Sequence, residues 1–402
     1  MRDSALHGEG WPRLAAAVSA AIDVDRSARF WGAFERPRGV PSAAALLRLT
    51  LARASGLSLR QVCALAAATG VAHLADASLV GRLGRADTVS WLAEIAGALL
   101  AEQLPTAEPQ RRLVLVDGTA ICHPGADRTS WRLHVAYDPV RRRLDAFELT
   151  DGRGAERFSR FAWRAGDVAV ADRYYARPGE LRPLLEAGAD LVVRIGWNAL
   201  RLLTATGAPF DLMAALDHVG ASPGEHAVRV DDRRPDPPLL RLVIAPLPAR
   251  EAEAARRRLC QEAKKRGRTP DARSLRAAGF LMLLTSLPAD AVAPERACAL
   301  YRLRWQVELV FKRLKSLLGL GMLPAKSPEL ARVWLYGKLI LALLAETEAD
   351  LLRRALPPSA EPAALPLANL PRRAAQPDRR HPRAADRRAV ASRRAAPRSA
   401  PR

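Results

Sequence analysis

Two aspartates follow short apolar runs that are typical of buried β-strands. Asp117 comes directly after Leu113–Val116, and Asp172 comes directly after Val168–Ala171. In open α/β sheets the strand ends form the functional crevice, so carboxylates that are distant in sequence can meet there. Facing carboxylates repel each other unless a proton or a cation lies between them, and oxygen ligands favour Mg²⁺ or Mn²⁺ over zinc. The pattern predicts a divalent-metal site; the alternative is that each aspartate merely ends a strand and begins a turn.

A third carboxylate, Glu308, lies in a segment with a helical pattern. In one continuous helix with about 100° per residue, Tyr301, Arg304, Glu308 and Lys315 fall in a stripe about 60° wide, opposite a face of leucine and valine. Tyr301 and Trp305 lie toward the polar side, where an ordinary surface would rarely expose two aromatic side chains. We predict that this face binds a ligand; the alternative is a solvated charged face, as on most amphipathic helices.

Residues 1–105 are predicted to form a helical domain that binds DNA. Apolar residues at helical spacing predict helices over 41–54, 59–68 and 89–104. Ser58 and Gln61 have the spacing of a capping box, and Asp76 or Ser78 is expected to cap a further short helix. Two short helices across a tight turn fit a helix-turn-helix DNA reader, and they fit any small bundle equally well.

The remaining elements predict an α/β fold. Residues 106–195 contain three strands in a meander and then alternate between helix and strand, which is the order of an RNase H-like catalytic core. Residues 196–290 are predicted to be an inserted, mostly β subdomain around a charged segment. The core is expected to resume over 291–352, with one long helix over 294–318 and another over 327–352. The predicted fold is an RNase H-like domain with this insertion, preceded by the helical N-terminal domain.

The charge of the chain points to a polyanionic partner. The formal net charge is +21 and the sequence pI is about 11.1, so nucleic acid is the first partner to consider. Charge alone does not settle the class, because a ribosomal protein, a membrane-surface protein and a nuclease would share it. The positions of the carboxylates are needed to distinguish these classes of protein.

The last fifty residues differ from the rest. Residues 353–402 contain 13 Arg, 14 Ala and 9 Pro and no aromatic residue, a composition that predicts a disordered tail. GC-rich codons read in a wrong frame specify these same three residues. We therefore expect an out-of-frame or truncated ending and a poorly active protein.

Compartment and membrane association are predicted from the apolar runs and the cysteines. The four cysteines are scattered without a Cys-x-x-Cys pair, which favours a reducing cytosol over secretion and gives no zinc motif. No apolar stretch reaches the roughly 20 residues needed to cross a bilayer, and the N-terminus does not have the pattern of a signal peptide. We expect a cytoplasmic, nucleoid-associated protein with no membrane partner.

A family resemblance follows from the spacing around the third carboxylate. The pattern Tyr-x-x-Arg-x-x-x-Glu-x-x-x-x-x-x-Lys, matched without a gap by Tyr301, Arg304, Glu308 and Lys315, resembles the signature of the DDE transposases of the insertion-sequence-4 group. Four residue types at fixed spacing, after two strand-end aspartates in the right order, make a specific match.

Other stretches resemble the same family over roughly 46–352. They are VDGTAICHPG around Asp117, WRLHVAYD, and ADRYYA, which contains Asp172 and Tyr175. Family members usually carry glycine where this chain has Tyr174. We expect this departure to crowd the backbone beside Asp172.

The resemblance implies a cut-and-paste transposition reaction. Asp117, Asp172 and Glu308 would hold two Mg²⁺ ions, with Mn²⁺ as a substitute, for in-line attack of water or a 3′-hydroxyl on phosphate. Arg304 and Lys315 would contact phosphates of the transposon end, the arginine through a planar fork and the lysine as a point charge. The partners would be the terminal inverted repeats and the target DNA, bound by a homodimer that holds two ends.

Three further aromatic residues enter the resemblance. Tyr301 would position a phosphate or pack against a sugar. Trp197 and Phe280 are candidates to stack on a base flipped out near the cleavage site, although an aromatic in that region is more often simply buried.

Two other functions remain open at the level of sequence. One is a catalytically impaired transposase remnant that still binds transposon-end DNA, which the unusual tail favours and the three carboxylates disfavour. The other is an RNase H-like nuclease that only hydrolyses DNA, which would not explain Arg304 and Lys315 beside the glutamate.

Overall fold

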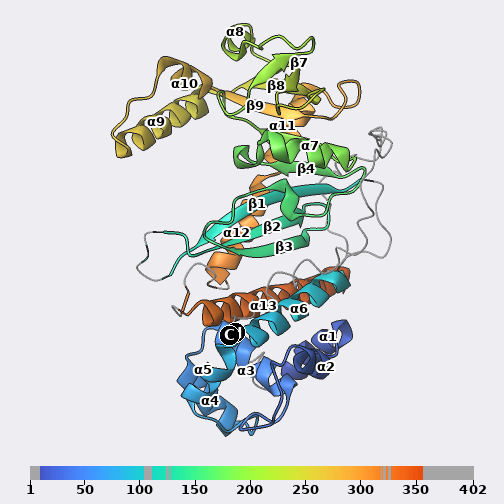
Figure 1. Cartoon of the computed structure of the whole chain (residues 1–402), viewed down its shortest axis with the longest axis vertical. Helices are drawn as coiled ribbons and strands as arrows, with labels where there is room; N and C mark the ends of the chain where they lie inside the picture. Colours follow the sequence, from blue (N-terminus) through green and yellow to red (C-terminus); the bar gives the residue numbers. More distant parts are fainter. Residues whose placement is uncertain are drawn as a thin grey trace, which may run out of the picture.

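The computed structural model describes residues 10–103, 111–123, 126, 128–317, 319, 323, 324 and 327–355. A group of helices forms one end of the molecule, and a large sheet with helices on both faces forms the rest (Figure 1). The mixed α/β class expected from the sequence is confirmed. Most of the predicted tail, from residue 356 onward, lies outside the described residues. Within the described part of the chain, no helix is long and apolar enough to span a membrane.

The N-terminal helices are α1 (Gly10–Ala21), α2 (Val24–Phe30), α3 (Ala43–Ser55), α4 (Leu59–Ala68), α5 (Asp76–Leu83) and α6 (Ala86–Gln103). Three of them, α3, α4 and α6, lie where the apolar spacing predicts them, whereas that spacing does not predict α1 and α2 individually. The predicted capping box is present, because Gln61 N donates to Ser58 Oγ at 3.2 Å and Ser58 N donates to Gln61 Oε1 at 2.8 Å. The predicted cap of α5 is wrong: Ala75 is the N-cap and makes no side-chain bond, whereas Asp76 already lies in the first turn.

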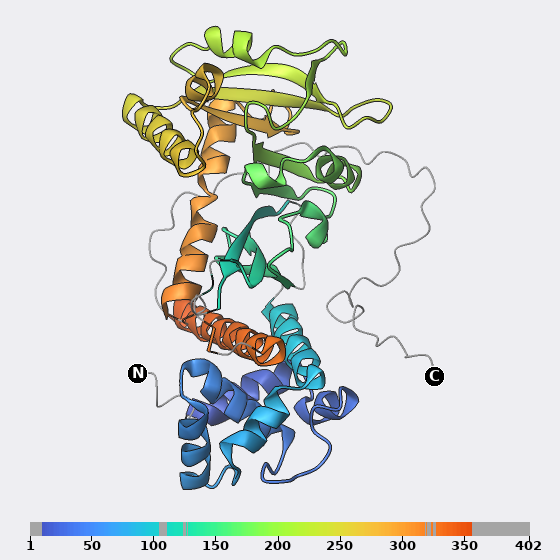
Figure 2. The same cartoon turned by 60° about the vertical axis from the view of Figure 1, so that its left-hand side comes forward.

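The last helix completes the N-terminal group. Helix α13 (Pro328–Ala355) packs against α6 and α3 (Figure 2). Gln103 donates from Nε2 to the Leu343 carbonyl at 2.8 Å, and a Cβ added at Gly337 would stand 2.8 Å from the Cβ of Ala54. Close approach of α13 and α3 therefore needs glycine at this crossing. The predicted helix over 327–352 exists, and it packs with the beginning of the chain.

Within the described residues, the sheet has nine strands. They are β1 (Leu113–Ile121), β2 (Trp131–Asp138), β3 (Arg143–Asp151), β4 (Val168–Ala171), β5 (Asp190–Arg194), β6 (Leu202–Thr204), β7 (Gly224–Val230), β8 (Leu239–Pro246) and β9 (Phe280–Thr285). Their order is β3-β2-β1-β4-β5-β9-β8-β7-β6. Strands β1, β4 and β5 are parallel to one another, and the other pairs are antiparallel.

The segment expected as an insertion, 196–290, joins this same sheet. Its strands β6 to β9 extend the sheet beyond β5. Three helices accompany them, namely α8 (Leu212–Asp217), α9 (Ala249–Lys265) and α10 (Ala272–Ala277). The charged stretch between β8 and β9 thus forms α9 and α10, and α9 projects from the sheet (Figure 1).

The long helix expected over 294–318 is broken, so that prediction is wrong. Helix α11 (Pro294–Arg302) ends with Leu303 as its C-cap, and α12 (Trp305–Leu317) begins three residues after Arg302. Backbone bonds from Arg304 N to the Tyr301 carbonyl, 3.0 Å, and from Gln306 N to the Leu303 carbonyl, 2.9 Å, tighten the chain at the break. The two helices pack on different strands, α11 on β4, β5, β8 and β9 and α12 on β1.

Alternation along the central strands decides which face carries the chemistry. Leu115 packs in the core that includes α11, α12 and α13, whereas Val116 packs on the opposite face with α7 (Pro178–Glu186). Strand β4 alternates in the same way. Figure 2 shows α11 and α12 along one side of the sheet and α7 along the other. Asp117 lies two residues after Leu115, and Asp172 lies two residues after Val170, so both aspartates lie on the face that α11 and α12 cover.

Candidate active site

Two neighbouring parallel strands bring the aspartates together. The register pairs Val116 of β1 with Ala171 of β4, so the next residues, Asp117 and Asp172, occupy equivalent positions. Strand β4 ends there, as expected. Strand β1 does not, because Asp117 pairs with Val135 of β2 and the strand continues. Asp117 is therefore a mid-strand residue beside the end of β4.

Asp172 is fixed by the short 3₁₀ turn that follows β4. Its carboxylate caps this turn, Arg173–Tyr175, by accepting from Tyr174 N at 3.1 Å. The expected crowding by Tyr174 is not found, because its side chain points into solvent with 56% exposure and its ring lies 5.4 Å from the Arg173 guanidinium. A tyrosine replaces the family's glycine without a positive φ at this position.

Asp117 is the most perturbed acid of the site. Its side chain is 15% exposed, and it accepts hydrogen bonds from Gly118 N at 2.8 Å and Arg304 Nη1 at 3.1 Å. Burial raises the pKa of Asp117 to about 7; the two hydrogen-bond donors oppose this rise, and the charges of Glu156 and Asp172 add to it. Such an acid either binds a proton at neutral pH or gains from a nearby cation.

Arg304 supplies a cation at this position. It lies in the break between α11 and α12, and its guanidinium also donates to Glu308 Oε1 at 2.5 Å. Burial lowers the pKa of Arg304, but Tyr301, Asp117 and Glu308 together raise it above its ordinary value, so the side chain stays charged. One guanidinium thus connects a carboxylate of β1 with a carboxylate of α12.

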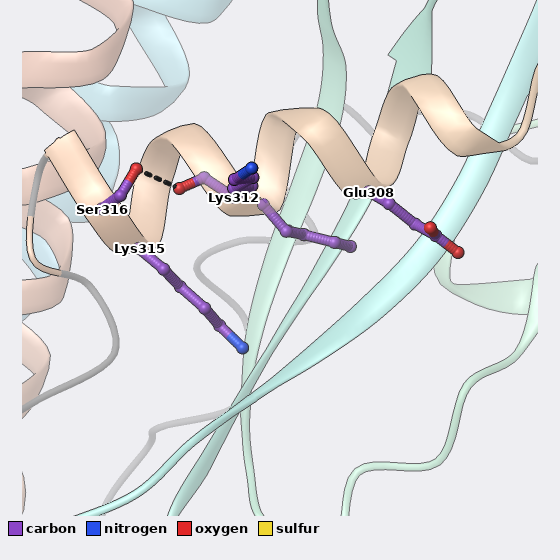
Figure 3. A pocket seen from close by; sticks show the side chains of 5 residues that line it. Glu308, Lys312, Lys315 and Ser316 are labelled. Carbon is purple, nitrogen blue, oxygen red and sulfur yellow. Dashed lines mark hydrogen bonds between the residues drawn. The ribbon is translucent and has the colours of Figure 1, made fainter.

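The remaining signature residues separate into a buried and an exposed group. Tyr301 is only 8% exposed, with its ring 5.9 Å from the Arg304 guanidinium, so its expected place on an open polar stripe is wrong. Trp305 is 53% exposed, as expected. Glu308 and Lys315 extend from the same side of α12 (Figure 3). They line an open hollow of about 520 Å³ together with Phe311, Lys312 and Ser316.

Glu156 is a fourth carboxylate that the sequence did not single out. Its side chain is 10% exposed and accepts from Arg132 Nη1 at 2.6 Å. Burial raises the pKa of Glu156, the charge of Arg132 opposes this rise, and the charge of Asp172 adds to it. The residue lies in an irregular polar segment between β3 and β4, where no strand-end pattern marks it. Only the buried ion pair reveals it, and that requires the tertiary structure.

Asp117, Asp172 and Glu308 are called here the carboxylate triad. Hard oxygen ligands of this kind suit Mg²⁺ or Mn²⁺, and the charge balance of Asp117 favours an added cation. Across the described ranges, however, no group of three or more His, Cys, Asp or Glu side chains is already arranged to hold a metal ion. The donor chemistry therefore fits a divalent ion, and Arg304 stands between two of the donors.

The two aromatic candidates for base stacking lie in the segment 196–290, which follows both aspartates and precedes Glu308 in the sequence. Trp197 donates from Nε1 to Ser274 Oγ at 3.1 Å, and Phe280 begins β9. Both are partly buried and pack against the core on the α7 face. Their present contacts are those of packing residues.

Comparison with known proteins shows the family to which the chain belongs. Residues 108–344 match the model of the transposase DDE domain. The chain is 42% identical over 345 residues, 84% of this chain and 93% of the relative, to the putative transposase InsL for insertion sequence element IS186A of Escherichia coli K12. It is 42% identical over 346 residues, with the same coverage, to the transposase for insertion sequence element IS421 of Escherichia coli.

A more distant match is confined to part of the chain. The transposase for insertion sequence element IS231F of Bacillus thuringiensis subsp. israelensis is 33% identical over 116 residues, 29% of this chain and 24% of the relative. Together the domain match and the full-length relatives define a transposase. The chain belongs to the DDE transposases of the insertion-sequence-4 group. Such enzymes act on the DNA of insertion-sequence ends.

Proposed function

We propose that this chain cleaves the ends of its insertion sequence and joins them to target DNA in a Mg²⁺-dependent, cut-and-paste reaction. The observation that carries the proposal is the double contact of Arg304, which binds Asp117 and Glu308 although Arg304 and Asp117 lie 187 residues apart in the chain. Asp172 adjoins Asp117 through the parallel pairing of β1 and β4. We also infer that β1 to β5, with their order β3-β2-β1-β4-β5, form an RNase H-like core.

The carboxylate triad would hold the metal ions. Two divalent ions at such a site supply an activated water or 3′-hydroxyl and stabilise the leaving oxygen in an in-line displacement on phosphate. The chain's own residues fix the geometry. Asp117 and Asp172 are spaced by adjacent strands, and Glu308 is 55% exposed on the side where DNA can approach.

The cations beside the triad would position the DNA backbone. Arg304 can bind a phosphate through its planar fork, and Lys315 can bind one as a point charge. Glu308 and Lys315 are seven residues apart on α12, which corresponds to a rise of about 10 Å. This distance matches about three base pairs along the DNA axis. A stretch of α12 of this length can therefore follow the transposon end next to the cleavage site.

Other parts of the proposal concern assembly and end recognition. Helices α4 and α5, two short helices separated by a turn, are the proposed reader of the terminal inverted repeat within the helical domain 1–105. Strand transfer needs both ends in one complex, so we propose a homodimer on paired ends. The DNA substrate places this activity in the bacterial cytoplasm.

The test uses the full chain and supercoiled DNA that carries paired inverted repeats. Mg²⁺-dependent release of the element and joined products would support the proposal. Binding of the ends without cleavage would instead support an impaired remnant that still binds transposon-end DNA. Cleavage without joining would indicate a nuclease.

A further inference from the structure

Glu156 lies against the backbone next to Asp117. A Cβ added at Gly118 would stand 2.9 Å from Glu156 Cγ and 3.2 Å from its Cδ, closer than real Cβ atoms approach other atoms without a shift. The glutamate side chain therefore occupies the space in which residue 118 would otherwise carry a side chain. Glycine at position 118 therefore lets Glu156 lie against the strand segment that holds Asp117.

Glu156 is held in this place by an arginine of the adjacent strand. Arg132 lies on β2 opposite Ala120 of β1, and its Nη1 donates to Glu156 Oε1 at 2.6 Å. Both side chains are mostly buried, with exposures of 26% for Arg132 and 10% for Glu156. A charge-assisted bond of this length in a low-dielectric setting restricts the rotamers of both residues.

The charge of Glu156 acts on both aspartates of the triad. Glu156 and Asp172 each raise the pKa of Asp117, and Asp172 raises the pKa of Glu156. The three carboxylates therefore lie within electrostatic reach of one another. Glu156 is already bonded to Arg132 at 2.6 Å, so its contribution is its field and its contact, not a ligand bond.

A buried tyrosine lies within the field of Asp117 and Glu156. Tyr175 is fully buried, and its hydroxyl has no hydrogen-bond partner among the residues that the structure describes. Asp117 and Glu156 are the acids whose charges act on this hydroxyl. A buried polar atom without a partner costs roughly 1–3 kcal/mol. Tyr175 packs in the core on the α7 face, so the charge of Glu156 reaches a polar atom that is buried on that face.

We propose that Glu156 is a positioning residue of the metal site: its negative charge, anchored by Arg132 and seated on Gly118, increases the affinity of Asp117 and Asp172 for divalent cations. This inference rests on the proposed function. Groups that contact and orient metal ligands commonly change metal affinity by about 10- to 100-fold when they are replaced. The same range is expected for Glu156.

The test measures Mn²⁺ binding to the full chain without DNA, by loss of the free-ion electron paramagnetic resonance signal. Glu156→Gln keeps the shape and an oxygen that accepts from Arg132, but it removes the charge. We expect its Mn²⁺ affinity to fall by about 10- to 100-fold. The matched control is Glu180→Gln, because the Glu180 side chain has the same 10% exposure as that of Glu156 and accepts from Ser159 N at 2.9 Å. This control should bind Mn²⁺ like the wild type.

The variant Asp172→Asn distinguishes a failure of the inference about Glu156 from a failure of the proposed metal site. If Asp172→Asn loses Mn²⁺ binding while Glu156→Gln matches the Glu180→Gln control, the inference about Glu156 is overturned and the proposed metal site stands. If Asp172→Asn also binds normally, the proposed function loses its metal site. Should Glu156→Gln fail to fold in metal-free melting, Arg132→Gln takes its place, and an unchanged Mn²⁺ affinity in that variant overturns the inference.

Discussion

Replacing Asp117 with asparagine is expected to stabilise the metal-free protein at neutral pH, although it removes a proposed ligand. Burial is the main cause that raises the pKa of Asp117 from 3.8 to about 7. Asparagine keeps an oxygen that accepts from Gly118 N, a contact of 2.8 Å in the wild type, and it never ionises. The substitution therefore removes an unfavourable buried charge and keeps the local shape.

The size of the effect follows from proton linkage. The carboxyl of Asp117 ionises near pH 3.8 in the unfolded chain and near pH 7 in the folded one. Between these values only the unfolded chain releases the proton, so the wild type loses about 1.4 kcal/mol of stability for each pH step of one. The loss is absent below about pH 4 and reaches about 4 kcal/mol above pH 7. Partial screening of a side chain that is 15% exposed reduces this to roughly 2–4 kcal/mol.

Urea unfolding in the presence of EDTA measures the prediction at pH 5 and pH 8. The advantage of Asp117→Asn should be about 1–2 kcal/mol at pH 5 and about 2–4 kcal/mol at pH 8. Asp232→Asn is a control of opposite sign, because the hydrogen bond from Arg182 holds the pKa of Asp232 below its ordinary value. That variant should lose stability at neutral pH, and the loss should shrink as the pH falls. An advantage of Asp117→Asn that does not grow between pH 5 and pH 8 would refute the reasoning.

Three further predictions use cleavage, binding and unfolding assays. Alanine at any one position of the carboxylate triad should abolish Mg²⁺-dependent nicking and leave end binding largely intact, because phosphate contacts supply most of the affinity; nicking by the variant at the glutamate position would contradict the assignment. Arg304→Ala and Lys315→Ala should each flatten the salt dependence of end binding by about one counterion, and unaltered slopes would favour a plain solvated helix face. Gly337→Ala should destabilise the fold by about 1–3 kcal/mol, because its Cβ would stand 2.8 Å from that of Ala54. Gly97→Ala, in a helix with open space around it, should instead stabilise by about 0.5–1 kcal/mol in urea unfolding, and an equal effect of both substitutions would argue against the close crossing.

The aspartate pair could be predicted from sequence because strand geometry is local. Apolar runs before Asp117 and Asp172 identify two buried strands, and period-two alternation places both side chains on one face. These apolar runs do not show how long each strand is. Strand β1 continues past Asp117 because β2 pairs with it there, and that partner lies outside the pattern. The sequence therefore placed Asp172 correctly at the end of β4 and misjudged only the position of Asp117 within β1.

Tertiary contacts account for what the sequence could not provide. Glu156 has no periodic neighbours, and its importance lies in an ion pair with Arg132 and in contact with Gly118. The packing of α13 on α3 likewise depends on one glycine, Gly337, that a helical pattern does not mark. Both features join segments that are distant in sequence, and a single-segment pattern cannot encode such a contact.

The broken helix explains how the spacing around Glu308 still produces a site. A straight helix would place Tyr301 on the same open face as the glutamate, yet the structure buries Tyr301 on the sheet side and keeps Glu308 exposed. Arg304 and Glu308 remain in contact at 2.5 Å across the break. At this break Arg304 also reaches Asp117 at 3.1 Å. The fixed spacing of these residue types therefore serves two purposes. Helix α11 packs on the sheet through the buried Tyr301, and the turn that follows places Arg304 between two carboxylates.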